Sequence, residues 1–149
     1  MASEHGHAAS PVGAVQCVVV TPERAVVDET VEFVALPMYD GELGVAPGRA
    51  ALIGRLGYGE LRTRSGTTVH RYFVDGGFAQ VRDNVVTVLT PRAMKAEEID
   101  VAKATQELEA ARAPAAGERQ AEQLKAQERA RAQIHVAQKA HGDGGHPHG

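Results

Sequence analysis

The composition of the chain changes sharply near residue 91, and this change limits the fold more than any other feature. Val, Gly, Thr and Pro dominate before that point, whereas Ala, Glu, Gln, Lys and Arg dominate after it. Val and Thr favour strands, and Ala, Glu, Gln and Lys favour helices. The sequence therefore predicts an α+β chain, with an N-terminal antiparallel β-sandwich over residues 15–91 and a C-terminal antiparallel two-helix hairpin over residues 92–140.

About seven short strands are predicted in the first part, a number typical of a sandwich or barrel. Residues 16–20 form a continuous apolar run, and residues 30–36 alternate between apolar and polar positions. One hairpin is predicted to turn at Ser65–Gly66 and a second one across residues 82–84. The pair Gly76–Gly77 indicates a bulge or a close approach between backbones.

The second part predicts a helix over residues 94–112, a break over residues 113–117 and a second helix over residues 118–139. Ala supplies most of the apolar positions on both helices. A buried methyl group contributes only about 0.8 kcal/mol, against roughly 1.5–3 kcal/mol for a buried Leu or Ile. We therefore expect the hairpin to dock weakly on the sandwich and to be able to detach where a partner compensates.

The two ends of the chain are short and polar or rich in Gly, so we expect residues 1–14 and residues 141–149 to be disordered tails. The first residues lack the basic start and apolar run of a secretory signal, and no run approaches 18 apolar residues. We therefore expect no membrane-spanning segment. Three His residues of the second tail match no closed zinc pattern, so we predict no metal site.

Catalytic chemistry has few candidates in this chain. Cys17 is the single cysteine and lies in an apolar run, where a buried, unreactive thiol is expected. His70 falls in a predicted strand and His135 in a predicted helix, so neither joins a nucleophile and an acid into a triad. The glycines of residues 41–44 and 54–59 lack the ending of a phosphate-binding loop. With a formal net charge of −3, no general attraction to nucleic acid is predicted either. We therefore predict no catalytic residues.

Several unusual segments occur together in one order. They are TVEFVALP (30–37), DGELGVAPGRAAL (40–52), VDGGFAQV (74–81) with NVVTVL (84–89), and AEEIDVAKA (96–104). Together they closely resemble the epsilon subunit of F-type ATP synthase, over about residues 15–112. The resemblance implies a noncatalytic rotor component that binds the gamma subunit and the c-ring and couples proton movement to ATP synthesis.

The same resemblance implies contact with the alpha and beta subunits of the catalytic head and a peripheral position, through the complex, on the cytoplasmic face of a bacterial inner membrane. No cofactor is implied as a requirement. A protein of another class stays open as an alternative, namely a free-standing β-sandwich module that binds proteins and carries a helical docking arm.

In the family, the Gly-Glu-x-Gly segment and the following Pro-Gly turn face the polar loops of the c-ring. The resemblance therefore makes Glu42 and Arg49 the candidate c-ring contacts, although Arg49 stands where the family usually has His. The residues that would shape this contact loop are Gly41, Gly44, Pro47 and Gly48. The alternative is that Glu42 and Arg49 are solvated loop residues.

Two further sites are implied by the resemblance. Ile99, Asp100, Lys103 and Ala104 match the family's nucleotide motif, except that Lys103 replaces an Arg, so weak ATP binding as a regulatory ligand is expected. The alternative for Asp100 is helix initiation. Basic residues of the second helix would meet an acidic segment of the beta subunit and inhibit ATP hydrolysis; here they are Arg119, Lys125, Arg129 and Arg131. A solvated helix face is the alternative.

Overall fold

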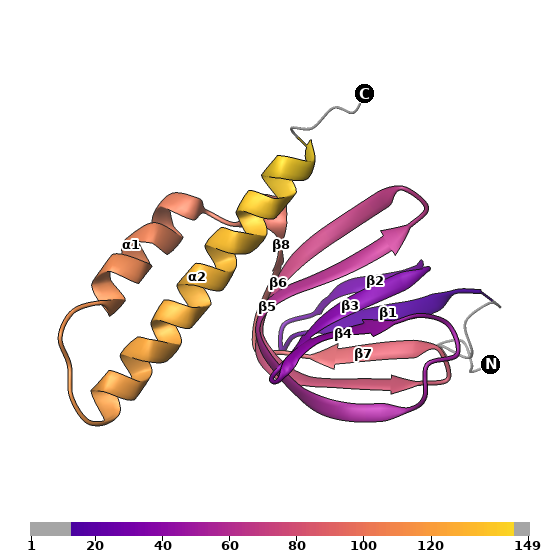
Figure 1. The fold of residues 1–149 in the computed structure, drawn as a ribbon, viewed down its shortest axis with the longest axis horizontal. Coiled ribbons are helices and arrows are strands. Elements are labelled where there is room, and N and C mark those ends of the chain that lie inside the picture. Colours follow the sequence, from indigo (N-terminus) through magenta and orange to yellow (C-terminus); the bar gives the residue numbers. More distant parts are fainter. Residues whose placement is uncertain (1–12, 145–149) are drawn as a thin grey trace.

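The computed structural model describes residues 13–144 (Figure 1). Its strands are β1 (Val15–Val20), β2 (Ala25–Val31), β3 (Phe33–Met38), β4 (Gly41–Val45), β5 (Leu52–Ser65), β6 (Thr68–Arg82), β7 (Val85–Leu89) and β8 (Ala93–Lys95). A short 3-10 helix, η2 (Ala96–Glu98), leads into α1 (Val101–Ala111) and α2 (Glu118–Gly144). The predicted sandwich followed by a two-helix hairpin is confirmed. Most of the predicted N-terminal tail lies outside the described residues.

The strands follow one hydrogen-bonded path, β2-β1-β7-β6-β5-β3-β4, with β8 added to β6. Every pairing is antiparallel except that of β1 with β7, which is parallel. The path closes into two layers because β5 and β6 are long and curved, so that one end of this hairpin pairs with β7 and the other with β3 and β8 (Figure 1). The main core lies between the layers and is built largely from Val and Leu side chains.

The bend of the long hairpin depends on Gly77. Its φ is +104°, and a Cβ atom there would overlap the carbonyl oxygen of Leu89. An L side chain rarely adopts this backbone conformation, and the neighbouring β7 backbone leaves no room for one. The close backbone approach predicted for Gly76–Gly77 is therefore confirmed. The second predicted hairpin is also confirmed, since Asp83 and Asn84 have φ values of 51° and 62°, as a two-residue I′ turn requires.

Four local predictions were wrong. Residues 94–100 do not belong to the long helix, because β8 pairs with β6 and the separate 3-10 helix η2 follows it before α1 begins. The turn of the β5–β6 hairpin is Gly66–Thr67, one residue later than predicted. Residues 41–45 form strand β4 and not a loop. Finally, α2 continues to Gly144, so the predicted tail is helical over residues 141–144.

The helical hairpin folds down on the sandwich, with α2 against the bend of β5 and β6 and α1 on the far side of α2 (Figure 1). Val136 of α2 is fully buried in a second cluster with Phe73 of β6, Ala96 and Ile99. The two helices contact each other, and small residues are buried on both, Ala104 and Ala111 on α1 and Ala130 on α2. No helix within residues 13–144 combines the length and the hydropathy needed to cross a membrane.

Candidate interaction surfaces

The Pro-Gly segment after β4 forms a tight turn. The backbone N–H of Arg49 donates to the carbonyl oxygen of Ala46 at 3.2 Å, with Pro47 and Gly48 between them. Gly48 has a φ of +88°, as the third residue of a type II turn requires. Its N–H also donates to Oδ1 of Asn84 at 2.7 Å, which ties this turn to the β6–β7 hairpin. The turn therefore presents the exposed Arg49 side chain on a fixed backbone.

The two other glycines of the predicted contact loop have different roles in β4. Gly41 begins the strand with a φ of +137°. Gly44 has no unusual φ, but a Cβ there would lie 2.8 Å from Cζ of Phe33, so any larger residue would require the Phe33 ring to shift. Because β4 is the edge strand next to β3, this segment presents a free backbone edge as well as side chains.

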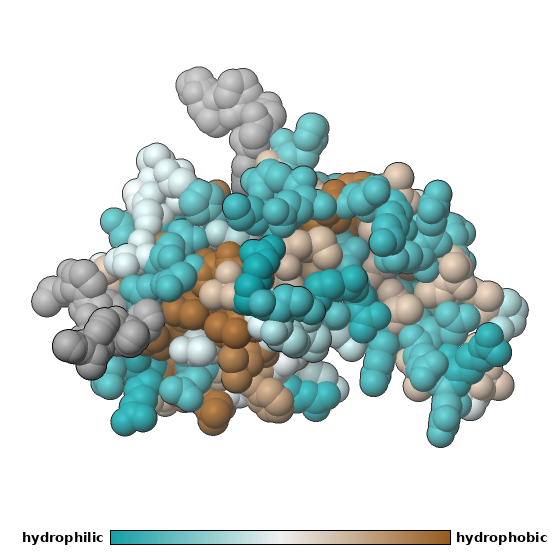
Figure 2. All heavy atoms as spheres, turned by 180° about the vertical axis from the view of Figure 1, so that it is seen from behind, coloured by the Kyte–Doolittle hydropathy of each residue, from teal (hydrophilic) through white to brown (hydrophobic). Residues whose placement is uncertain are grey.

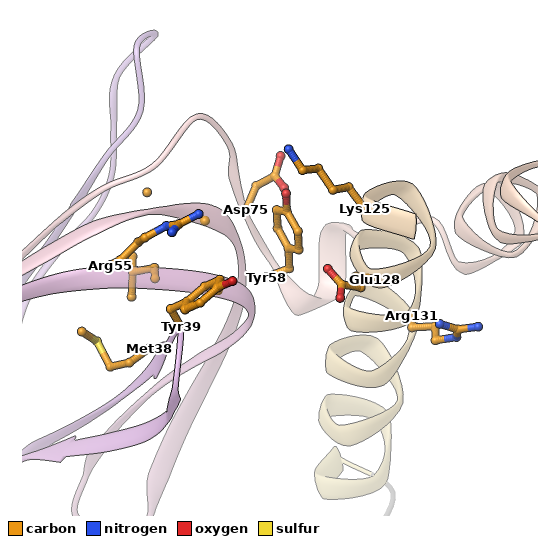
Figure 3. Close-up of a pocket in the computed structure, with 12 residues that line it drawn as sticks. Met38, Tyr39, Arg55, Tyr58, Asp75, Lys125, Glu128 and Arg131 are labelled. Carbon is orange, nitrogen blue, oxygen red and sulfur yellow. The ribbon is translucent and has the colours of Figure 1, made fainter. Parts of the chain in front are cut away.

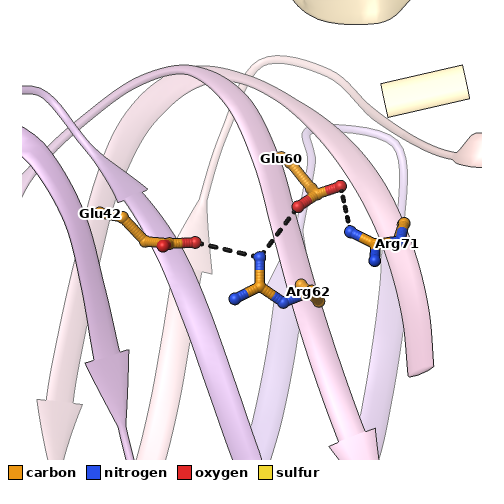
Figure 4. A network of polar contacts seen from close by, with 4 residues as sticks. All are labelled: Glu42, Glu60, Arg62 and Arg71. Carbon is orange, nitrogen blue, oxygen red and sulfur yellow. Dashed lines mark hydrogen bonds and ion pairs between the residues drawn. The ribbon is translucent and has the colours of Figure 1, made fainter. Parts of the chain in front are cut away.

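Glu42 belongs to a network of ion pairs on the outer face of the layer that contains β3 and β4 (Figure 4). Arg62 Nη1 lies 3.1 Å from Glu42 Oε2 and 3.0 Å from Glu60 Oε1. Arg71 Nη1 approaches Glu60 Oε2 to 2.7 Å. The side chain of Glu42 is 57% exposed while that of Glu60 is 11% exposed, so Glu42 is the accessible end of the network. Glu42 lies near the start of β4 and Arg49 in the turn that follows the strand, and no described contact joins them.

An exposed apolar row crosses the outer face of the other layer. Ile53, Phe78 and Leu89 are 72%, 57% and 55% exposed. Phe78 pairs directly with Leu89 of β7 and, on its other side, with Arg55 of β5, two residues from Ile53, so these side chains share one face. Tyr39 extends the row, since the Arg55 guanidinium lies 4.4 Å from its ring centre. Figure 2 shows hydrophobic surface gathered on the sandwich, whereas the helical part is more hydrophilic.

Sequence reasoning missed this apolar row, although the sequence carries a signal for it. Leu52–Ile53 and Val88–Leu89 are adjacent apolar pairs within strands. Because successive side chains of a strand point to opposite faces, such pairs place an apolar side chain on the solvent face as well as in the core.

The residues of the nucleotide motif divide into two kinds. Ile99 and Ala104 are buried, at 9% and 1% exposure, and serve packing. Asp100 is the N-cap of α1, where its Oδ1 accepts from the backbone N–H of Lys103 at 3.0 Å. Asp100 therefore starts α1, which is the helix-initiating role expected of it. The Lys103 side chain is exposed.

The basic residues of α2 are not equivalent. Arg119, Lys125 and Arg131 are exposed. Arg129 turns toward the sandwich, where its Nε donates to Oδ1 of Asp75 at 2.8 Å. This hydrogen bond raises the pKa of Arg129 above its usual value. A cavity of about 640 Å³ opens beside this contact (Figure 3). In that view the Lys125 side chain extends toward Asp75 and Tyr58, and the Arg131 guanidinium points away from the sandwich.

Two titratable side chains of the core, Cys17 and Tyr72, have raised pKa values. Burial raises the pKa of the Cys17 thiol to about 12, so the thiolate is suppressed. Tyr72 donates its hydroxyl to Oε2 of Glu29 at 2.8 Å, and burial together with this bond raises the pKa of Tyr72. In the described part of the chain, no three His, Cys, Asp or Glu side chains cluster in a way that could hold a metal ion.

The fold and its surfaces define a small α+β protein that exposes an apolar row and an edge strand on a sandwich and folds a helical hairpin against its side. Residues 14–96 match the family of the ATP synthase delta/epsilon chain beta-sandwich domain. The chain is 60% identical over 94 residues to the ATP synthase epsilon chain of Rhodopirellula baltica, covering 63% of this chain and 73% of that protein. It is 49% identical over 86 residues to the epsilon chain of Pelotomaculum thermopropionicum, covering 58% and 64% respectively. The chain belongs to the ATP synthase delta/epsilon chain family.

Solved structures extend the likeness beyond the sandwich. A chain of the Euglena gracilis mitochondrial ATP synthase, in a structure of OSCP, F1 and c-ring, superposes with a TM-score of 0.70 at 25% identity over 91% of this chain and 86% of that one. A chain of the Tetrahymena thermophila mitochondrial ATP synthase, from its central stalk and c-ring, shares the fold with a TM-score of 0.61 at 14% identity, over 88% and 98%. The helical hairpin is thus part of the shared fold.

Proposed function

We propose that this chain is the epsilon subunit of an F-type ATP synthase, a noncatalytic component of the central stalk that binds the gamma subunit and the c-ring and couples proton translocation to ATP synthesis. Family membership and the names of the relatives support this role. Both structural relatives come from ATP synthase assemblies, and one of these assemblies is a central stalk with its c-ring. We assign the chain, as part of such a complex, to a peripheral position on the cytoplasmic face of a bacterial inner membrane.

The observation that carries the proposal is the exposed apolar row. Three large apolar side chains on one face of neighbouring strands, each more than half exposed, are typical of an interaction site. Burying one such side chain contributes about 1.5–3 kcal/mol, and aromatic anchors often dominate the energy of an interface. We assign this row to the gamma subunit, with Phe78 as its central anchor because it pairs with residues on both sides.

The c-ring contact is assigned to β4 and the turn that follows it. Glu42 near the start of edge strand β4 and Arg49 in the turn that follows it present one negative and one positive side chain, which suits contact with polar loops. Arg62 holds Glu42 in place. Replacing Arg49 with Glu should weaken coupling without unfolding the protein, because the side chain is exposed and its turn is held by backbone bonds. Unchanged ATP-driven proton pumping in the reconstituted enzyme would count against this assignment.

The hairpin is assigned a regulatory role. In the docked position Arg119, Lys125 and Arg131 are exposed, whereas Arg129 is bound to the sandwich and becomes available to an acidic segment of the beta subunit only after α2 leaves it. Deleting residues 114–149 should therefore raise ATPase activity of the assembled enzyme. We also propose that ATP binds weakly near Asp100 and Lys103 and favours the docked position of the hairpin. Titration calorimetry of the full chain with millimolar ATP tests this binding. An absence of heat would contradict it.

The gamma assignment is tested by binding of the full chain to purified gamma subunit. Phe78→Ser should weaken binding by at least 2 kcal/mol, or about 30-fold, if Phe78 is an anchor. Val69→Ser is the matched control, because Val69 is a 38% exposed apolar residue at the other end of the same strand. Equal binding by both variants would contradict the assigned surface, and no binding by the unaltered chain would contradict the proposed function.

A further inference from the structure

The carboxylate of Asp75 lies where the sandwich meets α2. It comes from the bend of β6, and its side chain is only 10% exposed. Its own backbone N–H donates to the Arg92 carbonyl oxygen at 3.0 Å and to Thr90 Oγ1 at 3.2 Å, so the position of the residue is fixed from within the sandwich. A carboxylate so little exposed needs a cationic or hydrogen-bonding partner, since an unpaired buried charge is costly.

Two arginines approach this carboxylate, and they do so unequally. Arg129 Nε lies 2.8 Å from Oδ1, within hydrogen-bonding distance, whereas Arg92 Nε lies 3.9 Å from Oδ2 and is 51% exposed. The Arg129 guanidinium also lies over the ring of Tyr58, at 5.2 Å from its centre. A carboxylate beside an aromatic face offers a guanidinium a hydrogen bond and a stacking surface together.

We propose that Asp75 and Tyr58 form an arginine-binding site on the sandwich, that its occupant is Arg129 of the same chain, and that this contact holds the hairpin docked. The site lies on β5 and β6, and its occupant lies 54 residues further along the chain. This site differs from the apolar contact of Val136 with Phe73, because it binds one functional group, the guanidinium, whereas the apolar contact depends on the hydrophobic area that is buried.

The site also divides the basic residues of α2 into two groups. Arg129 is bound to the sandwich and its side chain is 32% exposed, whereas Arg131, two positions later, is exposed and, among the described residues, hydrogen-bonds within the helix to Gln127 Oε1 at 3.3 Å. While Arg129 occupies the site it is withheld from any acidic partner. This consequence rests on the proposed function, in which the same helix meets the beta subunit. The arginine-binding site itself does not depend on the proposed function.

The test uses hydrogen exchange of the full isolated chain, followed by mass spectrometry of α2 and sandwich peptides. We expect Asp75→Asn and Arg129→Gln each to speed exchange in α2 about 10-fold, as the loss of one charge-assisted hydrogen bond predicts. The double variant should be no faster than either single one, because both remove the same contact. Arg129→Lys should show an intermediate effect, since it keeps the charge and loses the planar group.

Arg131→Gln is the matched control, since it removes the same charge from the same helix without touching the site; exchange in α2 should be unchanged. Peptides of β1 and β7 should stay slow in every variant, which shows that the sandwich is folded. Additive effects of the two substitutions, or equal effects of Arg129→Gln and Arg131→Gln, would overturn the site. Binding to gamma is a separate measurement, so its failure would remove the proposed function and leave the site standing.

Discussion

Replacing Val136 with Ala should release the helical hairpin without unfolding the sandwich. Val136 is fully buried against Phe73, at the contact between α2 and β6. Loss of two carbons costs about 1.6 kcal/mol. The cavity left beside the rigid sandwich adds up to about 1 kcal/mol, and the better helix propensity of Ala returns about 0.5 kcal/mol. The net cost of about 2 kcal/mol falls on docking and corresponds to a roughly 30-fold larger undocked population.

Hydrogen exchange measures this population directly, because an undocked helix as polar as α2 frays in water. Amides of α2 should exchange about 30-fold faster in Val136→Ala, while those of β1 and β7 keep their rates. Leu124→Ala is the matched control: Leu124 also lies on α2 but is 54% exposed, so its loss should change exchange little. The reasoning is refuted if Leu124→Ala has the larger effect, or if the sandwich amides accelerate as much as those of α2.

Three further predictions concern stability. Gly77→Ala should lower the free energy of unfolding by about 3 kcal/mol in urea titrations, because the positive φ and the backbone overlap both oppose a Cβ atom. Gly66→Ala is the control: its φ is +61° but the space around it is open, so it should lower the free energy of unfolding by only about 1 kcal/mol. Asp100→Ala should cost about 1 kcal/mol and speed exchange in the first turn of α1, while Asp100→Asn should not. Cys17 should resist thiol reagents in the folded chain. Since its pKa rises from 9.0 to about 12 on folding, its contribution to stability is complete below pH 9 and is lost as the pH rises toward 12, measurable by urea titration across that range.

The sequence predicts the architecture well where residues close together in the chain determine the local structure. The division near residue 91 separates strand formers from helix formers, and the break over residues 113–117 falls between α1 and α2, with Gly117 at φ +67°. Gly77 signals its own constraint, because a glycine pair inside a strand usually marks a bulge or a close backbone approach. These features depend on residues close together in the chain.

The errors arise where distant contacts override local preference. Residues 94–98 contain good helix formers, yet β8 pairs with Tyr72–Val74 of β6, and this pairing delays the helix until Asp100 caps it. Similarly, Gly41–Val45 contains two glycines and looks like a loop, but β3 supplies backbone partners that make it a strand.

The candidate sites show the same limit. Charge alone places Arg129 among the exposed basic residues of a helix, and nothing in the neighbouring sequence indicates that Asp75 lies against it. The sequence predicts Glu42 as a contact residue, but its partner Arg62 is visible only once β3 has brought β4 and β5 to its two sides. A resemblance identifies which residues matter, whereas their pairing follows from the fold.

The role proposed for this chain, a stalk subunit of an ATP synthase, requires that it be physically part of the enzyme. Affinity purification of the tagged full chain from detergent-solubilised membranes of its own cell, followed by mass spectrometry of what is retained, measures this. We predict recovery of the alpha, beta, gamma and c subunits with the tagged chain, and lower recovery of these subunits when the tagged chain carries Phe78→Ser. Recovery of the unaltered chain alone, or with proteins unrelated to ATP synthase, would contradict the proposed role.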